Sequence, residues 1–399
     1  MPANRAPGIA GVNSQVDFAV PALDSRLLTL DSALVFGGYG VFGGHVAREL
    51  ARRGIAVCVA GRDAARAAKA AAELGKGHTS LRADVSDRES CLAAVEGKSV
   101  AVNCAGPFQQ LNASLLEACL ERGLHYVDIS DDRRYAAMVR EYGPRFADAN
   151  LAAVYGASSL PSISLALAHV ALRAAPGERA SAEVMPRVKR VYATLFIGND
   201  NPKGQAAVRS AVESLGKSIS APQGTLRGLG DRRIVELPPP FGRKAAANFD
   251  CADYDLLAEA TGAREVVVQA SFEMPGVLAS IRLFSTCAPR LGKWLLPKLA
   301  GPGFVRRIMG CSAGIVQVEL LFDDGGTRRA AIVAPRDGQR MASLPCVLAV
   351  EALLQKKATA RGAMTACDLL GAESLIEGIV AEGFELEVDP SPAAIRPMQ

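Results

Sequence analysis

A cluster of glycines near the start of the chain is the feature that most constrains its fold. Residues 33–54 read ALVFGGYGVFGGHVARELARRG, and five of the eight residues from position 37 to position 44 are glycine. Glycine is costly in regular structure because it loses more backbone freedom on folding than other residues do. Five glycines between an apolar run and a helical pattern therefore indicate that another group must approach the backbone closely.

The sequence around and after this cluster alternates between short apolar runs and helical patterns. Strands of this kind, separated by helices, form right-handed βαβ units and a parallel sheet that is covered on both faces. We therefore predict an α/β, doubly wound Rossmann domain over residues 31–157, preceded by an extension over residues 1–30. The predicted strands are 33–37, 55–61, 78–84, 99–106, 125–130 and 151–156, and the predicted helices are 41–54, 63–74, 87–96, 110–122 and 132–149.

The glycine cluster lies at the first strand-to-helix turn, where a doubly wound fold binds a dinucleotide. Two spacings fit the fingerprint: Gly38-x-Gly40-x-x-Gly43 and Gly37-x-x-Gly40-x-x-Gly43. Such glycines make the turn, let the pyrophosphate reach backbone N–H groups and let the helix pack closely on the strand. The alternative is a glycine turn that serves the fold alone. The predicted cofactor contacts are Gly38, Tyr39, Gly40, Val41, Phe42 and Gly43.

The residues that end the second and third strands bear on the choice of cofactor. Arg62 follows the second strand about 20 residues beyond the glycines, where NAD-binding domains carry an acidic residue and an arginine instead accommodates a 2′-phosphate. Arg62 therefore favours NADP(H) over NAD(H), unless it is a solvated surface residue. Asp84 ends the third strand and is placed either to meet the adenine or to cap a turn.

Composition excludes several classes of protein. The chain has 399 residues, 49% of them hydrophobic and 22% charged, with a net charge of +4. This balance argues against a nucleic-acid partner. The nine cysteines form no CxxC pair and no metal-type spacing, which is typical of reduced thiols and predicts no metal site. Without an apolar signal-peptide core or a run long enough to span a bilayer, the sequence predicts a soluble, cytoplasmic protein.

From about residue 157 the pattern changes to longer, more polar alternating runs. We predict a helix at 162–173, strands at 188–198 and 265–274, and a hairpin at 315–334 that turns at residues 323–326. These elements predict an α+β domain over residues 158–340, built on a mixed or antiparallel sheet and serving substrate binding or dimerisation. Residues 341–399 are expected to form helices that pack back on the first domain, beginning with a helix at 343–357.

Three stretches of the first half resemble the NADP-binding domain of the saccharopine dehydrogenase family. They are VFGGYGVFGGHVARELARRG, VAGRDAARA and VNCAGPFQQLNASLLEACLERGLHYVDIS, and the resemblance extends through YGASSLPSISLALA and, more faintly, to the C-terminus. It implies that an alanine-glycine-proline turn after the fourth strand lies beside the nicotinamide ribose. The residues placed there are Asn103, Ala105, Gly106 and Pro107, with Phe108 near the ring.

Asp128 and Ser130 end the fifth strand at the same edge, either beside the cofactor or as helix caps. Ser158, which opens the next turn, is a further candidate contact. The four histidines start strands or lie on helices, and a structural role is expected for His45, His78, His125 and His169. The proton donor that hydride transfer usually needs is therefore unidentified. Weak catalytic candidates are Tyr155, Ser159 and Lys203, the last in the polar loop 197–205.

The second half also holds basic residues that could bind carboxylates but match no binding motif of the family: Arg187, Lys189, Arg190, Arg232, Arg233 and Arg243. The basic and apolar segment 282–307, with the single tryptophan Trp294, predicts either a helical insert packed on the core or on a second subunit, or a segment that touches lipid.

The resemblance implies an NADP(H)-dependent oxidoreductase that transfers hydride at a C–N bond of a small, amino-acid-derived substrate. We expect a homodimer. Two alternatives remain open: an enoyl or carbonyl reductase for a lipid or polyketide substrate, and a protein that binds NADP(H) without catalysis.

Overall fold

The computed structural model describes residues 32–173, 186–202, 217–229, 232–273 and 310–389. The predicted extension 1–30, the segment 282–307 and the candidate Lys203 lie outside these residues. No helix in the described part of the chain is long and apolar enough to cross a membrane.

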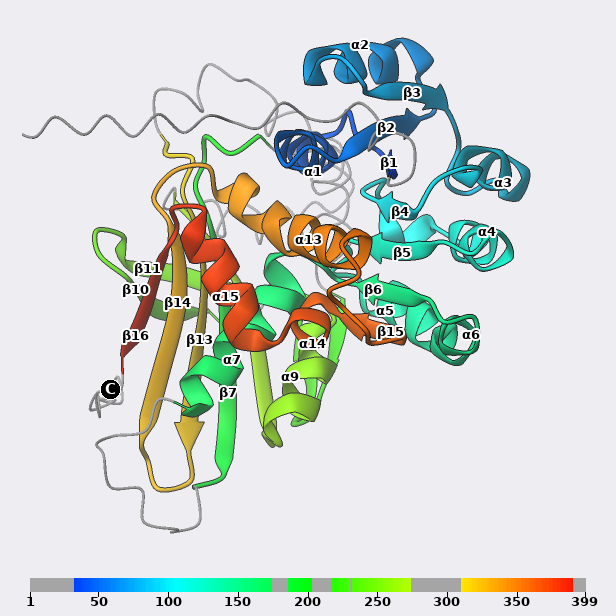
Figure 1. Cartoon of the computed structure of the whole chain (residues 1–399). Coiled ribbons are helices and arrows are strands. Elements are labelled where there is room, and N and C mark those ends of the chain that lie inside the picture. The colour runs from blue at the N-terminus through cyan, green and yellow to red at the C-terminus, as the bar shows by residue number, and fades with distance from the viewer. Residues whose placement is uncertain (1–31, 174–185, 203–216, 230–231, 274–309, 390–399) are drawn as a thin grey trace, which may run out of the picture.

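The first sheet confirms the predicted Rossmann domain. Within the described residues it has seven parallel strands in the order β15-β6-β5-β4-β1-β2-β3 (Figure 1). Strands β1 to β6 follow the order 3-2-1-4-5-6, which is that of a dinucleotide-binding sheet. The strands are β1 (Ser32–Phe36), β2 (Ala56–Gly61), β3 (Thr79–Arg82), β4 (Val100–Asn103), β5 (His125–Asp128), β6 (Ala152–Tyr155) and β15 (Gly362–Thr365).

Helices cover both faces of this sheet, because its strands are apolar on both sides. One face packs on α1 (Val41–Arg52), α2 (Ala64–Leu74) and α13 (Gly338–Leu354). The other face packs on α3 (Arg88–Val95), α4 (Ser114–Arg122), α5 (Arg133–Glu141) and α6 (Gly143–Asp148).

Two predicted helices of this domain differ from the structure. The helix expected at 110–122 begins only at Ser114, because a 3₁₀ turn, η2 (Phe108–Gln110), comes first and the Asn112 side chain accepts a bond from the Ser114 N–H. The helix expected at 132–149 is two helices, α5 and α6, divided at Tyr142. Gly143 opens α6 where Ala363 of β15 packs against it, 3.1 Å from where a Cβ would lie.

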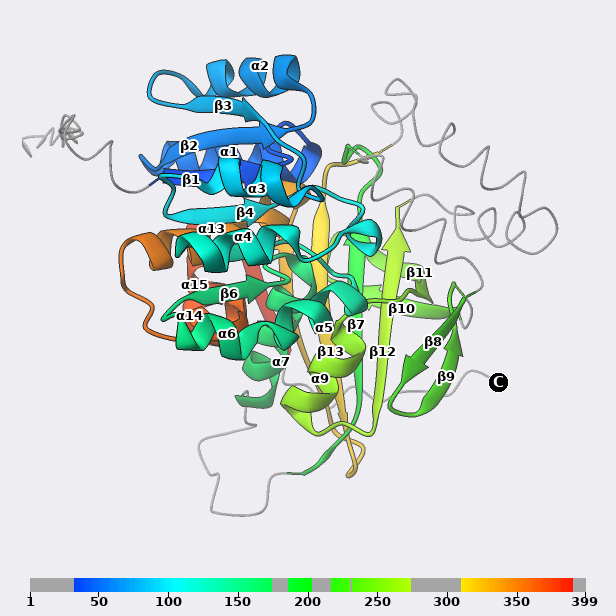
Figure 2. The same cartoon turned by 90° about the vertical axis from the view of Figure 1, so that its right-hand side faces the viewer.

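The second sheet is mixed, as predicted. Its order is β10-β11-β12-β7-β13-β14-β16, and the β12–β7 pair is parallel while the others are antiparallel. In Figure 2 its strands run across the direction of the first sheet. The strands are β7 (Val188–Ile197), β10 (Arg233–Leu237), β11 (Gly242–Asn248), β12 (Glu265–Phe272), β13 (Gly314–Phe322), β14 (Thr327–Ala334) and β16 (Glu385–Asp389).

The predicted hairpin turn at 323–326 is confirmed, since the Phe322 N–H donates to the Gly326 carbonyl at 2.9 Å. One face of the second sheet packs on α7 (Ser164–Arg173) and α9 (Asp253–Thr261), which bury its apolar side chains in the main core. The predicted helix at 162–173 corresponds to α7, preceded by a π-turn, η3 (Ser159–Ile163). A small separate hairpin pairs β8 (Ser218–Ala221) with β9 (Gly224–Arg227).

The C-terminal segment packs back on the first domain, but it is not only helical. The helix expected at 343–357 begins at Gly338 and lies along α1 (Figure 1). It is followed by α14 (Ala366–Leu370) and α15 (Ala372–Ala381), which pack on it and on one another. Strand β15 between α13 and α14 joins the first sheet, whereas β16 after α15 joins the second.

Candidate functional site

The glycine loop between β1 and α1 has the shape of a phosphate-binding turn. Gly37 has a φ of +71°, and its N–H donates to the Ala60 carbonyl of β2 at 2.8 Å. The chain then turns into α1 with Gly40 as its N-cap, and Gly40 is exposed. The first amides of a helix have no carbonyl one turn back to bind. Those of Val41 and Phe42 are therefore available to an anion at the positive end of the helix.

Gly37 and Gly43 allow three backbone segments to approach one another. A Cβ on Gly37 would lie 2.8 Å from the Cys104 carbonyl oxygen, and one on Gly43 would lie 2.3 Å from the Gly37 oxygen. Gly40, by contrast, faces open space apart from its own turn. The structure therefore fits the spacing Gly37-x-x-Gly40-x-x-Gly43, in which Gly37 makes the turn and Gly43 packs the helix.

A basic groove lies beside this loop, between α1 and α2. It has a volume of about 290 Å³, and Gly38, Tyr39 and Gly40 form one wall. Arg48 of α1 and Arg66 and Lys69 of α2 supply its cations, against the single acid Glu73. The predicted contacts Gly38, Tyr39 and Gly40 are thus brought together with three basic side chains that the sequence analysis missed.

Tyr39 is fixed over the end of β2. Its hydroxyl accepts a hydrogen bond from the Asp63 N–H at 3.2 Å, and the Arg66 guanidinium stacks 4.6 Å from the centre of its ring. A Cβ on Gly61 would lie 2.4 Å from this ring, so a side chain at this position would displace Tyr39. The cation–π contact orients Arg66 at the mouth of the groove.

Arg62 and Asp84 lie near one another at the ends of β2 and β3. Arg62 is exposed, and its charge helps to lower the pKa of Asp84, although the main cause is hydrogen bonding from Ser86. The Asp84 carboxylate accepts bonds from both the hydroxyl and the backbone N–H of Ser86. Asp84 therefore does cap a turn, and its position leaves it at the edge where adenine would lie.

The loop after β4 lies against the glycine loop, since a Cβ on Gly37 would be 3.0 Å from the Ala105 Cα. Asn103 is fully buried; its Oδ1 accepts the Ala105 N–H at 3.1 Å and its Nδ2 donates to the Tyr135 hydroxyl at 3.0 Å. Gly106 is exposed, whereas Pro107 and Phe108 are half-buried, and the Phe108 ring meets the Tyr135 ring edge-on at 5.0 Å. Asn103 thus supports the loop from its buried side, and residues 105–108 form the solvent-facing side of the loop.

Asp128 ends β5 behind this loop, where the structure does not expose it to a ligand. Its Oδ1 accepts the N–H groups of Ser130 at 2.9 Å and Gly156 at 3.0 Å. Burial raises the pKa of Asp128 to about 7 in spite of these bonds. Ser158, on the crossover that follows β6, donates its hydroxyl to the Ala342 carbonyl of α13 at 3.1 Å. Both side chains bind other parts of this chain.

Other polar candidates are also engaged in the fold. Tyr155 is only 4% exposed, and burial raises its pKa to about 12. Ser159 is buried at the start of η3. His78 and His125 accept hydrogen bonds at Nδ1 from the Val57 and Ala152 N–H groups, both at 3.1 Å.

Two of the basic residues that were candidates for carboxylate binding are paired with acids of the second sheet. Arg190 pairs with Glu265, and Arg233 pairs with Glu319. Arg233 also lies 3.7 Å above the centre of the Tyr192 ring. These two cations therefore bind groups of this chain.

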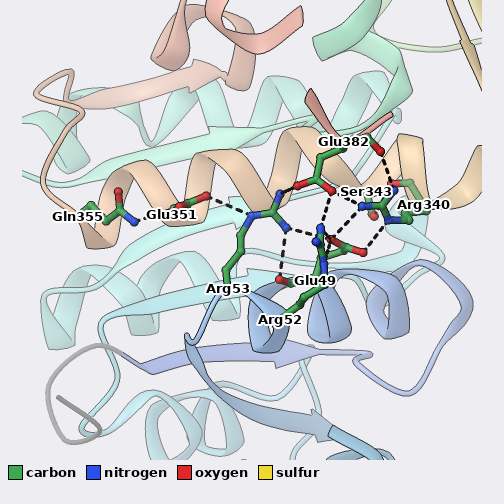
Figure 3. Close-up of polar contacts among 8 residues, drawn as sticks. All are labelled: Glu49, Arg52, Arg53, Arg340, Ser343, Glu351, Gln355 and Glu382. Atoms are coloured by element: carbon green, nitrogen blue, oxygen red, sulfur yellow. Dashed lines mark hydrogen bonds and ion pairs between the residues drawn. The ribbon is translucent and has the colours of Figure 1, made fainter. Parts of the chain in front are cut away.

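A cluster of ion pairs fastens the C-terminal segment to the first helix of the cofactor domain (Figure 3). Glu49 of α1 binds Arg53 at 2.9 Å and Arg340 of α13 at 2.7 Å. Glu382, after α15, binds Arg53 at 2.5 Å and also pairs with Arg340. Three arginines act on Glu49 and lower its pKa to about 2, although its burial works in the opposite direction.

Comparison with known proteins identifies the fold and the domain. Residues 33–154 match the family described as the saccharopine dehydrogenase NADP binding domain. Over 90% of this chain and 100% of the other, the structure matches apo saccharopine dehydrogenase (L-Glu forming) from Saccharomyces cerevisiae, with a TM-score of 0.62 and 11% identity. Residues 33–154 are therefore similar to a saccharopine dehydrogenase NADP binding domain, and the chain shares the fold of the yeast enzyme over 90% of its length.

Other solved structures are similar over about a third of this chain. A hydroxysteroid dehydrogenase from Escherichia coli covers 33% of this chain and 77% of its own at 18% identity, with a TM-score of 0.28. A short-chain type dehydrogenase/reductase from Mycobacterium ulcerans covers 31% and 66% at 18% identity, with a TM-score of 0.27. Among curated proteins, none matches this sequence significantly.

Proposed function

We propose that this chain is an NADP(H)-dependent oxidoreductase that transfers hydride at a C–N bond of an amino-acid-derived substrate. The observation that carries the cofactor choice is the basic groove beside the glycine loop. Arg48, Arg66 and Lys69 line it with a single acid, which favours an additional phosphate over a bare ribose. Exposed Arg62 adds a fourth cation at the adjacent end of β2.

The residues of the cleft fit a dinucleotide. The amides at the start of α1 would bind the pyrophosphate, and residues 105–108 would form the wall against the nicotinamide ring. Bound NADP(H) would supply the hydride at that ring. Asn103 would keep the 105–108 wall in place, because it binds the Ala105 N–H at 3.1 Å.

The ion pairs of the second sheet limit the choice of substrate. Saccharopine carries several carboxylates, but Arg190 and Arg233 are already paired with Glu265 and Glu319. We therefore propose an imine or amine substrate with fewer acidic groups. The same observation favours one alternative, a reductase of an uncharged enoyl or carbonyl substrate.

Fluorescence titration with NADPH and with NADH tests the cofactor proposal. Arg66→Ala should weaken NADPH binding about tenfold or more, the scale of one charge-assisted contact, and leave NADH binding unchanged. Arg145→Ala is the matched control, since Arg145 also stacks on a tyrosine, 5.0 Å from the Tyr142 ring, but on α6. Equal loss of both cofactors in Arg66→Ala would contradict the assignment of this groove to the phosphate.

Turnover separates the remaining possibilities. Absorbance at the nicotinamide band should fall when NADPH is mixed with cyclic or linear imines of amino acids. Turnover of enoyl or carbonyl compounds alone would favour the alternative reductase. Tight NADPH binding with no turnover of any of these classes would instead indicate a binding protein without catalysis.

A further inference from the structure

Four polar side chains form a buried line behind the loop that would hold the nicotinamide. Asn103 donates to the Tyr135 hydroxyl at 3.0 Å, and the Tyr135 and Tyr126 hydroxyls share a hydrogen bond of 2.9 Å. Tyr126 and Asp128 point to the same face of β5 because they are two residues apart on a strand. All four side chains are at least 97% buried.

One atom at the end of this line has no partner. Asp128 Oδ1 accepts two backbone N–H groups, but Oδ2 is buried without a hydrogen-bond partner. The Tyr126 hydroxyl lies close enough to this carboxyl to lower its pKa, against the larger effect of burial, although it makes its hydrogen bond to Tyr135. A fully buried carboxylate oxygen without a hydrogen-bond partner destabilises the folded state, so its presence calls for an explanation.

The line connects the 105–108 loop with the crossover that follows β6. At one end, Asn103 holds the Ala105 N–H and so the 105–108 loop. At the other end, Asp128 holds the Gly156 N–H, and its carbonyl accepts the Ala157 N–H at 2.7 Å. These two residues begin the crossover from β6 to α7, where the chain passes into the second domain.

The direction of the hydrogen bonds depends on the charge of Asp128. With the carboxylate ionised, Asn103 donates to Tyr135 and Tyr135 can donate to Tyr126, whose own proton can then turn towards Oδ2, an acceptor that has no other partner. A proton on Oδ2 reverses the last two bonds. Tyr135 then receives protons from both Asn103 and Tyr126, and its own proton loses its buried acceptor. Protonation therefore strains the line at Asn103.

We propose that Asp128 is a positioning residue: through Tyr126, Tyr135 and Asn103 its ionised form sets the 105–108 loop for the nicotinamide ring and so controls cofactor affinity. This inference rests on the proposed NADP(H) function of the same cleft. Asp128 does not touch the cofactor, because it is fully buried.

The groups that interact with Asp128 remain neutral near pH 7. They are Tyr126 on its own strand, Tyr135 on α5, Tyr155 on β6 and Cys346 on α13. Burial raises the pKa of each tyrosine, and a hydrogen bond with Cys104 together with burial raises the pKa of Cys346. Asp128, whose pKa is about 7, is therefore the member of this set that changes charge at neutral pH.

The test is the pH dependence of the NADPH dissociation constant, measured by fluorescence on the full chain between pH 6 and pH 8.5. Wild type should bind more tightly as the pH rises through about 7, by about tenfold if the strain at Asn103 amounts to one hydrogen bond. Asp128→Asn keeps the acceptor for Ser130 and Gly156 but places an NH₂ group at Oδ2. At every pH, this variant should bind NADPH with the dissociation constant that wild type shows at pH 6.

Two further variants separate this role from a purely structural one. Tyr135→Phe breaks the line of hydrogen bonds but leaves Asp128 able to titrate. The NADPH affinity of this variant should therefore no longer depend on pH. Its thermal stability should still change with pH as that of wild type does. Asp253→Asn is the matched control, because Asp253 is another fully buried carboxyl with a pKa raised to about 7, between α7 and α9. It should keep the wild-type affinity profile.

The outcomes are distinct. If a folded Asp128→Asn or Tyr135→Phe protein shows the wild-type pH profile of affinity, the positioning role is wrong while the cofactor proposal stands. If wild type binds neither NADPH nor NADH at any pH, the proposed function itself fails.

Discussion

The guanidinium group of Arg340 on α13 binds the carboxylate of Glu49 on α1, with Nε 2.7 Å from Oε1. The same guanidinium donates to the carbonyl of Glu382 at 3.1 Å. Helix α1 starts at the glycine loop, so a residue 291 positions further along the sequence fixes the helix whose first amides would bind the pyrophosphate. The proposed cofactor binding would thereby depend on the packing of α13.

Glu49→Gln should destabilise the protein by about 2 kcal/mol, since Arg53 and Arg340, both partly buried, would each lose one of the carboxylates that pair with them. Only 9% of the Glu49 side chain is exposed. The measurement is the free energy of unfolding in urea. Glu73→Gln is the control, because Glu73 is 64% exposed and pairs with Lys69 at 4.0 Å, so its loss should cost under about 0.5 kcal/mol. Equal effects of the two variants would contradict the role given to the cluster.

The same cluster predicts sensitivity to acid. The folded pKa of Glu49 is about 2, below its ordinary value of 4.5. Its contribution to stability is therefore complete above pH 4.5 and is lost as the pH falls from there towards 2. The free energy of unfolding, measured in urea at pH 3 and at pH 5, should differ less between the two pH values in Glu49→Gln than in wild type.

Gly43→Ala should impair both folding and cofactor binding, because its Cβ would lie 2.3 Å from the Gly37 oxygen and 3.0 Å from the Cys104 Cβ. At Gly44, one residue later in α1, a Cβ would lie 3.3 Å from the end of the Arg48 side chain and 3.7 Å from the Gly38 oxygen, which is an ordinary contact. Alanine favours a helix by about 1 kcal/mol over glycine, so Gly44→Ala should be neutral or stabilising. Thermal melts with and without NADPH compare the two, and similar destabilisation of both would contradict the close packing at Gly43.

The buried carboxyls predict a second pH effect, of opposite sign. The pKa values of Asp128 and Asp253 rise from 3.8 to about 7 on folding, because burial disfavours their charged forms. The folded state therefore binds more protons than the unfolded state, and stability falls as the pH rises from about 4 to about 7. Melting temperatures across this range should fall less steeply in Asp128→Asn and in Asp253→Asn. An unchanged slope in both would show that these groups titrate at ordinary values.

Substitution of His125 should lower the stability of the fold and leave cofactor binding unchanged. The Nδ1 atom of His125 accepts the Ala152 N–H at 3.1 Å, and burial lowers its pKa. His125→Ala leaves this N–H without an acceptor and should cost about 1–3 kcal/mol. Because the pKa is lowered, its contribution is lost as the pH falls below 6.5. His169→Ala on α7 is the control, and NADPH affinity should be unchanged in both.

Much of the first domain could be predicted because its signals are local. The apolar runs of β1, β2, β4, β5 and β6 and the glycines between β1 and α1 are read without knowledge of any partner. Strand β15 could not be predicted in this way, since residues 362–365 read GAMT, too short and too weakly apolar to stand out. It becomes a strand because β6 offers it a free edge. Strand β16, ELEVD, is charged and exposed, and it too is defined by its partner β14.

The candidate site likewise has one part that local sequence indicates and another that depends on tertiary packing. The glycine turn lies within one stretch of sequence, whereas the groove depends on how α1 and α2 pack. Arg66 and Lys69 are three residues apart and so share a face of α2, which is the one signal that could have indicated them. The line from Asn103 to Asp128 joins β4, α5 and β5, and the alternation of Tyr126 and Asp128 on β5 gives only a part of it.

The placement of β15 and β16 has a consequence for how the chain is made. Each is the edge strand of a different sheet, and both lie within residues 362–389. During synthesis, neither sheet gains its edge strand until residues 362–389 have left the ribosome. The Rossmann domain is translated earlier, but it depends on this segment for β15 as the second sheet depends on it for β16. A ribosome that stalls shortly before residue 362 therefore leaves the edges of β6 and β14 exposed together.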